Sequence, residues 1–128
     1  MCYVYTMGVH ILIVDDDEDI FDVLSTQLSE DGFQVSWAHD AESFRKRVFE
    51  EKPHLIILDI MLGRHCGPEV YRDLLSEGLS HNVPVIFLSA LVTDAELADA
   101  HPGRTYAMHS KPFAYEELLR DIRCLTAA

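Results

Sequence analysis

Short apolar runs alternate along the chain with longer segments in which apolar residues recur at helical spacing. The apolar runs cover 9–14, 33–38, 55–58, 83–88 and 105–108. Helical spacing is found over 18–30, through Phe44, Val48 and Phe49, through Val70, Leu74 and Leu75, near 94–100, and through Leu118, Leu119 and Ile122. This periodicity predicts an α/β fold in which five strands alternate with five helices.

The apolar runs are continuous rather than alternating, which favours a parallel sheet covered by helices on both faces. In such sheets, ligands collect just beyond the carboxyl ends of the strands. Polar residues follow four of the five runs at that point, namely Asp15 and Asp16, Asp59, Ser89 and Lys111. We therefore expect these five side chains at one edge of the sheet.

Length and composition favour one domain over residues 1–128, with a core from about 9 to 125 and no effector domain. A net charge of −12 without a basic run disfavours direct binding to nucleic acid. The three widely separated cysteines fit a reducing cytoplasm better than a disulfide framework. The opening run lacks a basic start and is too short to span a bilayer, so membrane insertion is not expected.

Three carboxylates at one edge repel one another unless a divalent cation lies among them. Mg²⁺ suits such a site, because it binds a few carboxylates and carbonyl oxygens and keeps positions open for a phosphoryl group. Asp59 can then attack phosphorus while Mg²⁺, Lys111 and the Ser89 hydroxyl hold the phosphoryl oxygens. The residues predict a phosphoryl-transfer site.

Four stretches carry a resemblance to a known family, namely 11-ILIVDDDEDI-20, 55-LIILDIMLGRHCG-67, 84-PVIFLSA-90 and 110-SKPF-113. In this order and at this spacing the chain resembles the receiver domain of bacterial two-component response regulators, over almost its whole length. The resemblance implies a single flavodoxin-like (βα)5 domain with a parallel sheet of strand order 2-1-3-4-5.

The resemblance also implies roles for individual residues. Asp59 would be the phosphoacceptor, Asp16 a direct Mg²⁺ ligand, Asp15 an acid that holds the metal mostly through water, the Met61 carbonyl a further ligand, Ser89 the switch hydroxyl, and Lys111 the partner of the phosphoryl group. The bond from Lys111 to Pro112 would be cis. The phosphoryl donor would be a histidine kinase or a histidine phosphotransfer protein, and the output a downstream protein partner or effector domain. Such a chain is a signalling phosphoacceptor rather than an enzyme.

Two departures from the family pattern concern the switch. Met108 replaces the aromatic switch residue, and Tyr106 would lie on the same face of a regular strand and could partly substitute for it. The pair 102-PG-103 interrupts the fourth helix, so the output surface is expected to differ from the common one.

Two further departures concern the loop and the lifetime of the phosphoryl group. Gly63 stands where a proline is common, which adds backbone freedom to the loop. Met61 and Leu91 are apolar at the two positions whose side chains help or hinder the attacking water, so slow self-dephosphorylation is expected.

Several simpler interpretations compete with these assignments. Asp17 and Asp19 read as ordinary acids at a helix start, His65 and Cys66 as loop residues, and Trp37 as a core residue. A receiver-like binding module that works without phosphorylation remains open. An aspartyl phosphatase also remains open, although such enzymes need a second acid where this chain has Met61.

Overall fold

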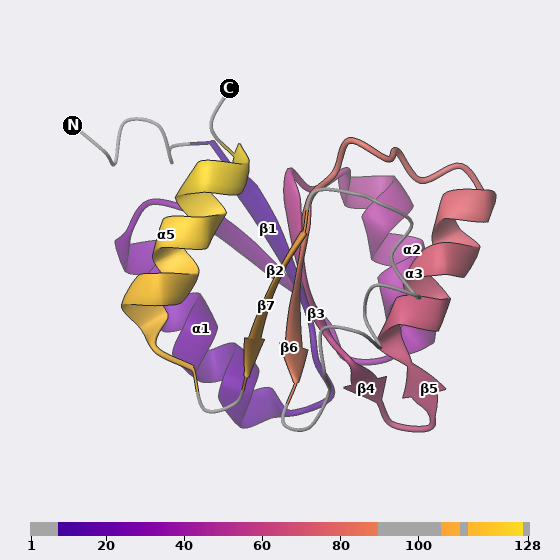
Figure 1. Cartoon of the computed structure of the whole chain (residues 1–128), viewed down its shortest axis with the longest axis horizontal. Helices are drawn as coiled ribbons and strands as arrows, with labels where there is room; N and C mark the ends of the chain where they lie inside the picture. Colours follow the sequence, from indigo (N-terminus) through magenta and orange to yellow (C-terminus); the bar gives the residue numbers. More distant parts are fainter. Residues whose placement is uncertain (1–7, 90–105, 111–112, 127–128) are drawn as a thin grey trace.

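The computed structural model of the chain describes residues 8–89, 106–110 and 113–126 (Figure 1). Its elements in chain order are β1 (His10–Val14), α1 (Glu18–Glu30), β2 (Gln34–Ala38), α2 (Ala41–Glu51), β3 (Leu55–Asp59), β4 (Met61–Leu62), β5 (His65–Cys66), α3 (Gly67–Ser76), β6 (Val85–Ser89), β7 (Tyr106–Ser110) and α5 (Tyr115–Thr126).

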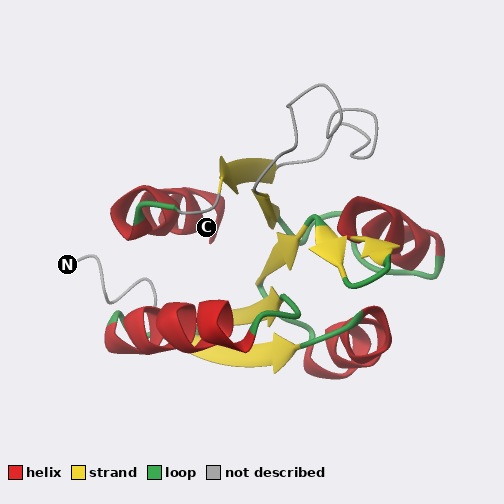
Figure 2. Cartoon of the chain, turned by 90° about the horizontal axis from the view of Figure 1, so that it is seen from below, coloured by secondary structure: helices red, strands yellow, loops and turns green. Residues whose placement is uncertain are grey.

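The main sheet has the strand order β2-β1-β3-β6-β7, and every neighbouring pair is parallel. This confirms the predicted order 2-1-3-4-5, with β6 and β7 as the fourth and fifth strands. Helices α1 and α5 cover one face and α2 and α3 the other, so the domain has three layers (Figures 1 and 2).

Two hydrophobic cores lie on the two faces of the sheet, because successive strand residues point to opposite sides. In β1, Leu12 and Val14 belong to the core with α2 and α3, whereas Ile11 and Ile13 belong to the core with α1 and α5. All residues of β3 and β6 are buried. Burial on both faces is the reason why these strands read as continuous apolar runs.

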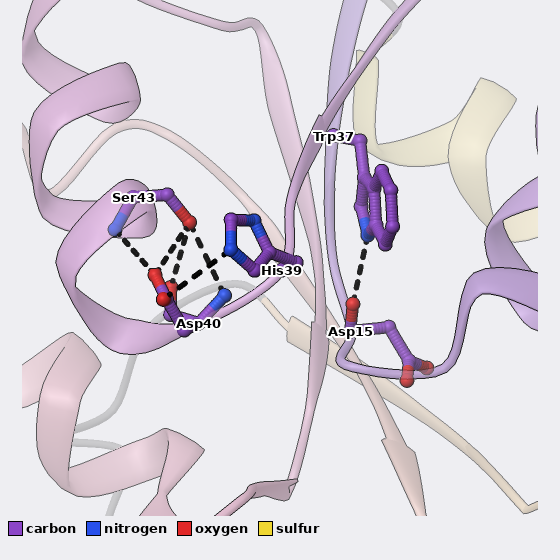
Figure 3. Close-up of polar contacts among 5 residues, drawn as sticks. All are labelled: Asp15, Trp37, His39, Asp40 and Ser43. Carbon is purple, nitrogen blue, oxygen red and sulfur yellow. Dashed lines mark hydrogen bonds and ion pairs between the residues drawn. The ribbon is translucent and has the colours of Figure 1, made fainter.

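Helices α1 and α2 begin at side chains that cap them. At the start of α1, the Asp17 carboxylate accepts a hydrogen bond from the Asp19 amide. At the start of α2, Asp40 and Ser43 form a capping box, in which the Ser43 amide donates to Asp40 Oδ1 at 2.7 Å (Figure 3). These bonds from Ser43 hold the pKa of Asp40 below its ordinary value. No helix within the described ranges has the length and apolar character needed to cross a membrane.

The structure adds one element that periodicity did not predict. β4 and β5 form an antiparallel hairpin, with Met61 opposite Cys66 and Leu62 opposite His65. The interpretation of His65 and Cys66 as loop residues was therefore wrong, because a strand of two residues is too short to show a period. The five predicted strands and the helix over 18–30 are confirmed to within two residues at their ends, and helices α2, α3 and α5 contain the residues through which they were predicted to run. The fourth helix, predicted near 94–100, lies outside the described residues.

Candidate functional site

Three carboxylates meet at the carboxyl edge of the sheet. Asp15, Asp16 and Asp59 each offer an oxygen, and these oxygens lie within 4.8 Å of one another. Asp15 is fully buried, Asp59 is 8% exposed, and Asp16 is exposed. They sit between β1 and β3, where the strand order reverses direction, which is the usual ligand position in a doubly wound sheet. The predicted clustering of these acids is confirmed.

Backbone amides hold each carboxylate in place. The Asp17 amide donates to Asp15 Oδ1 at 2.9 Å, and the Met61 amide donates to Asp59 Oδ1 at 3.2 Å. The Gly63 amide donates to Asp16 Oδ2 at 3.1 Å, across 47 positions of sequence. A carboxylate has about four acceptor positions, so one amide bond orients it and is compatible with a metal ligand. Backbone hydrogen bonds thus orient all three carboxylates of the cluster.

The hairpin that follows Asp59 explains one departure from the family pattern. Gly63 has φ +58 in the two-residue turn between β4 and β5, a conformation that proline cannot adopt. The Gly63 amide donates a hydrogen bond to Asp16. Proline could not make this bond, because it has no amide hydrogen. The sequence predicted a loop with added backbone freedom. The structure shows that this freedom is used to build a turn that contacts the acidic cluster.

The same hairpin places the Met61 carbonyl. Antiparallel partners alternate between pairs that exchange hydrogen bonds and pairs that point their N–H and C=O groups away from each other. The Gly67 amide donates to the Ile60 carbonyl at 2.6 Å, so Ile60 and Gly67 form a hydrogen-bonded pair. The next pair, Met61 with Cys66, is therefore one whose N–H and C=O groups point away from each other. The amide of Met61 points outward to Asp59, and its carbonyl points to the same side. This geometry is compatible with the predicted role of the carbonyl as a metal ligand.

Gly67 is a positioning residue that the sequence reasoning missed. A Cβ atom at this residue would overlap the Asp59 carbonyl oxygen and would lie 3.2 Å from the Asp59 carbonyl carbon and 3.3 Å from the Ile60 carbonyl oxygen. Only glycine allows the first turn of α3 to pack so closely on the backbone of Asp59. The signal available in the sequence was a glycine immediately before Pro68, where α3 begins.

Trp37 is a second residue whose role the sequence did not reveal. Its Nε1 donates to the Asp15 carbonyl at 2.8 Å, as Figure 3 shows. Its ring stacks on Phe21 with centroids 4.9 Å apart and an interplanar angle of 11°. The side chain is half-buried rather than a fully buried core residue. It connects β2 and α1 to the backbone of the acidic cluster.

Ser89 ends β6 beside the cluster. In the pairing of β3 with β6, Asp59 lies opposite Leu88, and the Ile60 amide donates to the Leu88 carbonyl at 3.0 Å. Ser89 is therefore the next residue along the neighbouring strand, and it is 6% exposed. The structure brings it to the same edge as the acids, as predicted.

The remaining residues of the predicted site lie wholly or partly outside the part of the chain that the structure describes. Lys111, the bond to Pro112, and Leu91 lie outside the described residues. Tyr106 and Met108 lie in β7, a regular strand, but their side chains are outside the described part of the chain. Their predicted roles stay predictions.

Electrostatics indicate what the cluster can bind. Two unit charges about 5 Å apart repel by roughly 1 to 3 kcal/mol at effective dielectric constants between those of water and a protein surface. A divalent cation removes this cost. Mg²⁺ at about 2.1 Å from octahedral ligands places their oxygens roughly 3 to 4 Å apart, which the observed spacing within 4.8 Å nearly meets. An all-oxygen set with one buried, one nearly buried and one exposed acid fits Mg²⁺.

A doubly wound parallel sheet with an oxygen-rich site at its switch point defines a class of domains that bind their ligand at the carboxyl edge. Within this class, residues 11–123 match the response regulator receiver domain, and the chain belongs to that family. The response regulator MprA of Mycobacterium ulcerans (strain Agy99) is 35% identical over 119 residues, which are 93% of this chain and 50% of that protein. The chain thus spans about half the length of the curated relatives it matches.

Solved structures agree with this assignment. The receiver domain of the Francisella response regulator 1452 is 24% identical, with a TM-score of 0.82 over 93% of this chain and 97% of that one, which shows a shared fold. NtrX from Brucella abortus is 28% identical, with a TM-score of 0.79 over 94% of this chain and 27% of that one. The chain is a receiver domain with a signalling role.

Proposed function

We propose that Asp59 accepts a phosphoryl group from a phosphohistidine and that the reaction requires Mg²⁺. The observation that carries the proposal is the cluster of Asp15, Asp16 and Asp59 at the edge where β1 and β3 diverge. Asp15, Asp16, Asp59 and the Met61 carbonyl would hold the metal, which supplies positive charge to neutralise the phosphoryl oxygens and the acids.

The residues of the chain position the reaction. The Met61 amide bond on Oδ1 fixes the orientation of the Asp59 carboxylate, which attacks phosphorus, and the bond from phosphorus to the histidine nitrogen breaks. Ser89, at the end of β6, would contact a phosphoryl oxygen, and its position next to Leu88, the strand partner of Asp59, supports this. Lys111 is proposed to pair with another, on the resemblance alone. The new charge then draws these two groups toward Asp59 and shifts a surface equilibrium.

The proposed partners follow from the same chemistry. A histidine kinase or a histidine phosphotransfer protein supplies the phosphoryl group, and a downstream protein or effector domain receives the signal. The chain acts as a phosphoacceptor and does not turn over a separate substrate. Cys66 and Cys124, the cysteines within the described residues, are not in disulfides, which supports a cytoplasmic location.

We further propose that the phosphoryl group is long-lived. The Met61 side chain is 55% exposed beside Asp59 and has no group that can orient an attacking water. Leu91 is the second apolar residue in the prediction. A phosphoprotein that persists well beyond seconds after removal of the donor would support this, and replacement of Met61 by Glu should shorten its lifetime.

One incubation separates the receiver from its competitors. The protein is mixed with Mg²⁺ and acetyl phosphate, and the intact mass and the released phosphate are followed for the wild type and for Asp59→Asn. A stable phosphoprotein that Asp59→Asn abolishes supports the proposal. Rapid phosphate release without accumulation would indicate an aspartyl phosphatase, and no labelling would indicate a binding module that works without phosphorylation.

A further inference from the structure

An apolar pocket lies at the end of the sheet opposite to the acidic cluster. Its volume is about 300 Å³, and it is formed by the end of α2 with the two residues after it and by the loop between α3 and β6. Its apolar lining consists of Val48, Phe49, Pro53, Leu79 and Val83. Phe49 is 38% exposed, so part of its ring faces solvent. A volume near the lower end of the range for small-molecule sites suits a ligand with one compact apolar group.

The pocket has a single charged residue in its lining, Lys52. Lys52 ends α2 with φ +49, the one positive φ of a non-glycine residue within the described ranges. Glycine or asparagine adopts this conformation at a helix end with less strain. Strain that the surrounding fold maintains is commonly found at functional positions. The chain thus keeps a long cationic side chain at a backbone position that favours a small residue.

Two acids adjacent in sequence to residues of the lining pair with other cations. Glu51, which precedes Lys52, binds Arg47 at 2.8 Å and lies 3.3 Å from His10. Glu77, which precedes Gly78, forms an ion pair with Arg45. No carboxylate of the described residues pairs with Lys52 itself. The ammonium group of Lys52, an exposed residue of the lining, is therefore available to a ligand.

We propose that this pocket binds a small organic acid, with the apolar body against Phe49 and Leu79 and the carboxylate on the Lys52 ammonium group. Ser80 is the other polar side chain in the lining and offers a hydroxyl to the same carboxylate. The negative charge of the acidic cluster does not repel a carboxylate at this distance. A five-residue strand is about 16 Å long, roughly twice the distance over which physiological salt screens charge.

Backbone-amide NMR spectra of the unphosphorylated protein test the proposal with three probes. Phenylpropionate carries both the apolar body and the carboxylate, phenylpropanol carries the body alone, and acetate carries the carboxylate alone. We expect saturable shifts at Phe49, Leu79 and Ser80 with phenylpropionate, at about millimolar affinity for a ligand of this size. Phenylpropanol and acetate should bind more weakly.

Substitutions at two lysines of the same helix region sharpen the test. Lys52→Asn keeps a residue that tolerates the left-handed backbone but removes the charge, and it should weaken phenylpropionate binding roughly threefold or more. Lys52→Arg should restore most of the affinity. Lys46→Asn is the matched control, because Lys46 lies outside the pocket lining, and it should leave the affinity unchanged.

Three results would overturn the proposal. Phenylpropanol could bind as tightly as phenylpropionate, which would remove the role of the carboxylate. No probe could give saturable shifts at the pocket. The pocket amides could instead shift when the protein alone is concentrated, which would show that a second copy of the chain fills the pocket. Each result is independent of phosphorylation at Asp59.

Discussion

Charged residues are arranged differently at the two ends of the parallel sheet. At the carboxyl end, Asp15, Asp16 and Asp59 are gathered within 4.8 Å, where they repel one another. At the amino end, two acids are paired with cations, Glu77 with Arg45 of α2 and Glu51 with Arg47, whereas Lys52 has no such partner among the described residues. The carboxyl end holds charges whose repulsion a ligand can remove, whereas the ion pairs of the amino end stabilise the fold.

A network around Glu51 illustrates how the amino end works. His10 Nε2 lies 2.8 Å from Ser36 Oγ and 3.3 Å from Glu51, and the His10 amide donates to His54 Nδ1 at 2.9 Å. Burial alone would raise the pKa of Glu51, but hydrogen bonds from Ser36 and Arg47 outweigh it, and the pKa lies below the ordinary value of 4.5. This acid is stabilised in its charged form without a metal.

The largest expected loss of stability comes from adding a side chain at Gly67, next to the backbone of Asp59. Gly67→Ala places a methyl group against the Asp59 backbone, so either α3 or β3 must move. We expect the free energy of unfolding to fall by about 3 kcal/mol, measured by urea denaturation, and phosphorylation to be lost. Gly63→Ala is the control, because no atom lies within 4 Å of its added carbon and only its φ of +58 is strained. It should cost about 1 kcal/mol. Equal losses for the two variants would contradict the close approach.

Neutralising one acid at each end should change stability in opposite directions. Without Mg²⁺, Asp16→Asn should raise the free energy of unfolding by up to about 1 kcal/mol, because it relieves repulsion. Glu51→Gln should lower it by about 1 kcal/mol, because it removes the negative charge that pairs with Arg47 and replaces one of the two acceptor oxygens by a donor. Addition of Mg²⁺ should stabilise the wild type and have little effect on Asp16→Asn.

The pH dependence follows from the lowered pKa of Glu51. A carboxyl group whose pKa is lowered by folding stabilises the protein above its unfolded pKa, near 4.5, and this contribution is lost as the pH falls through the folded value. Wild-type stability should therefore decrease more steeply than that of Glu51→Gln below this pH. Parallel curves for the two proteins would show that Glu51 contributes nothing.

A smaller effect is expected at Trp37. Trp37→Phe keeps a ring to stack on Phe21 but removes the donor to the Asp15 carbonyl, and it should cost about 1 kcal/mol. Trp37 is the single tryptophan of the chain, so its fluorescence should change when Mg²⁺ binds. This change should disappear in Asp16→Asn. An unchanged fluorescence on binding would mean that Trp37 does not sense the metal site.

The smallest effect is expected at the start of α2, away from both ends of this comparison. Asp40→Ala removes the capping box with Ser43 and should lower the free energy of unfolding by about 0.5 to 1 kcal/mol. Asp40→Asn, which can still cap the helix, should lose less. Thermal denaturation of the two variants checks this order, and an equal loss would indicate a role for charge rather than capping.

The sequence predicted the sheet and the acidic cluster because both leave local signals. Buried strands read as continuous apolar runs, and Asp15, Asp16 and Asp59 follow directly where two of those runs end. The signals at the carboxyl edge are chemical as well as periodic, because clustered acids after apolar runs are costly without a ligand.

What the sequence did not predict depends on contacts between distant residues. The β4–β5 hairpin is too short for periodicity, and the closeness of Gly67 to Asp59 arises only when α3 packs on the sheet. The hydrogen bond from the Trp37 indole to the Asp15 carbonyl connects β2 to the residue that follows β1. The pocket at Lys52 combines two segments, 48–53 and 78–83, that are separated along the chain.

The most direct test of the account locates the phosphoryl group itself. After incubation with acetyl phosphate, borohydride reduction converts a phosphorylated aspartate to homoserine, and peptide mass spectrometry identifies its position. We predict conversion at Asp59 alone, present with Mg²⁺ and abolished by a chelator. Conversion at another acid, or at Asp59 equally without Mg²⁺, would contradict the proposed site.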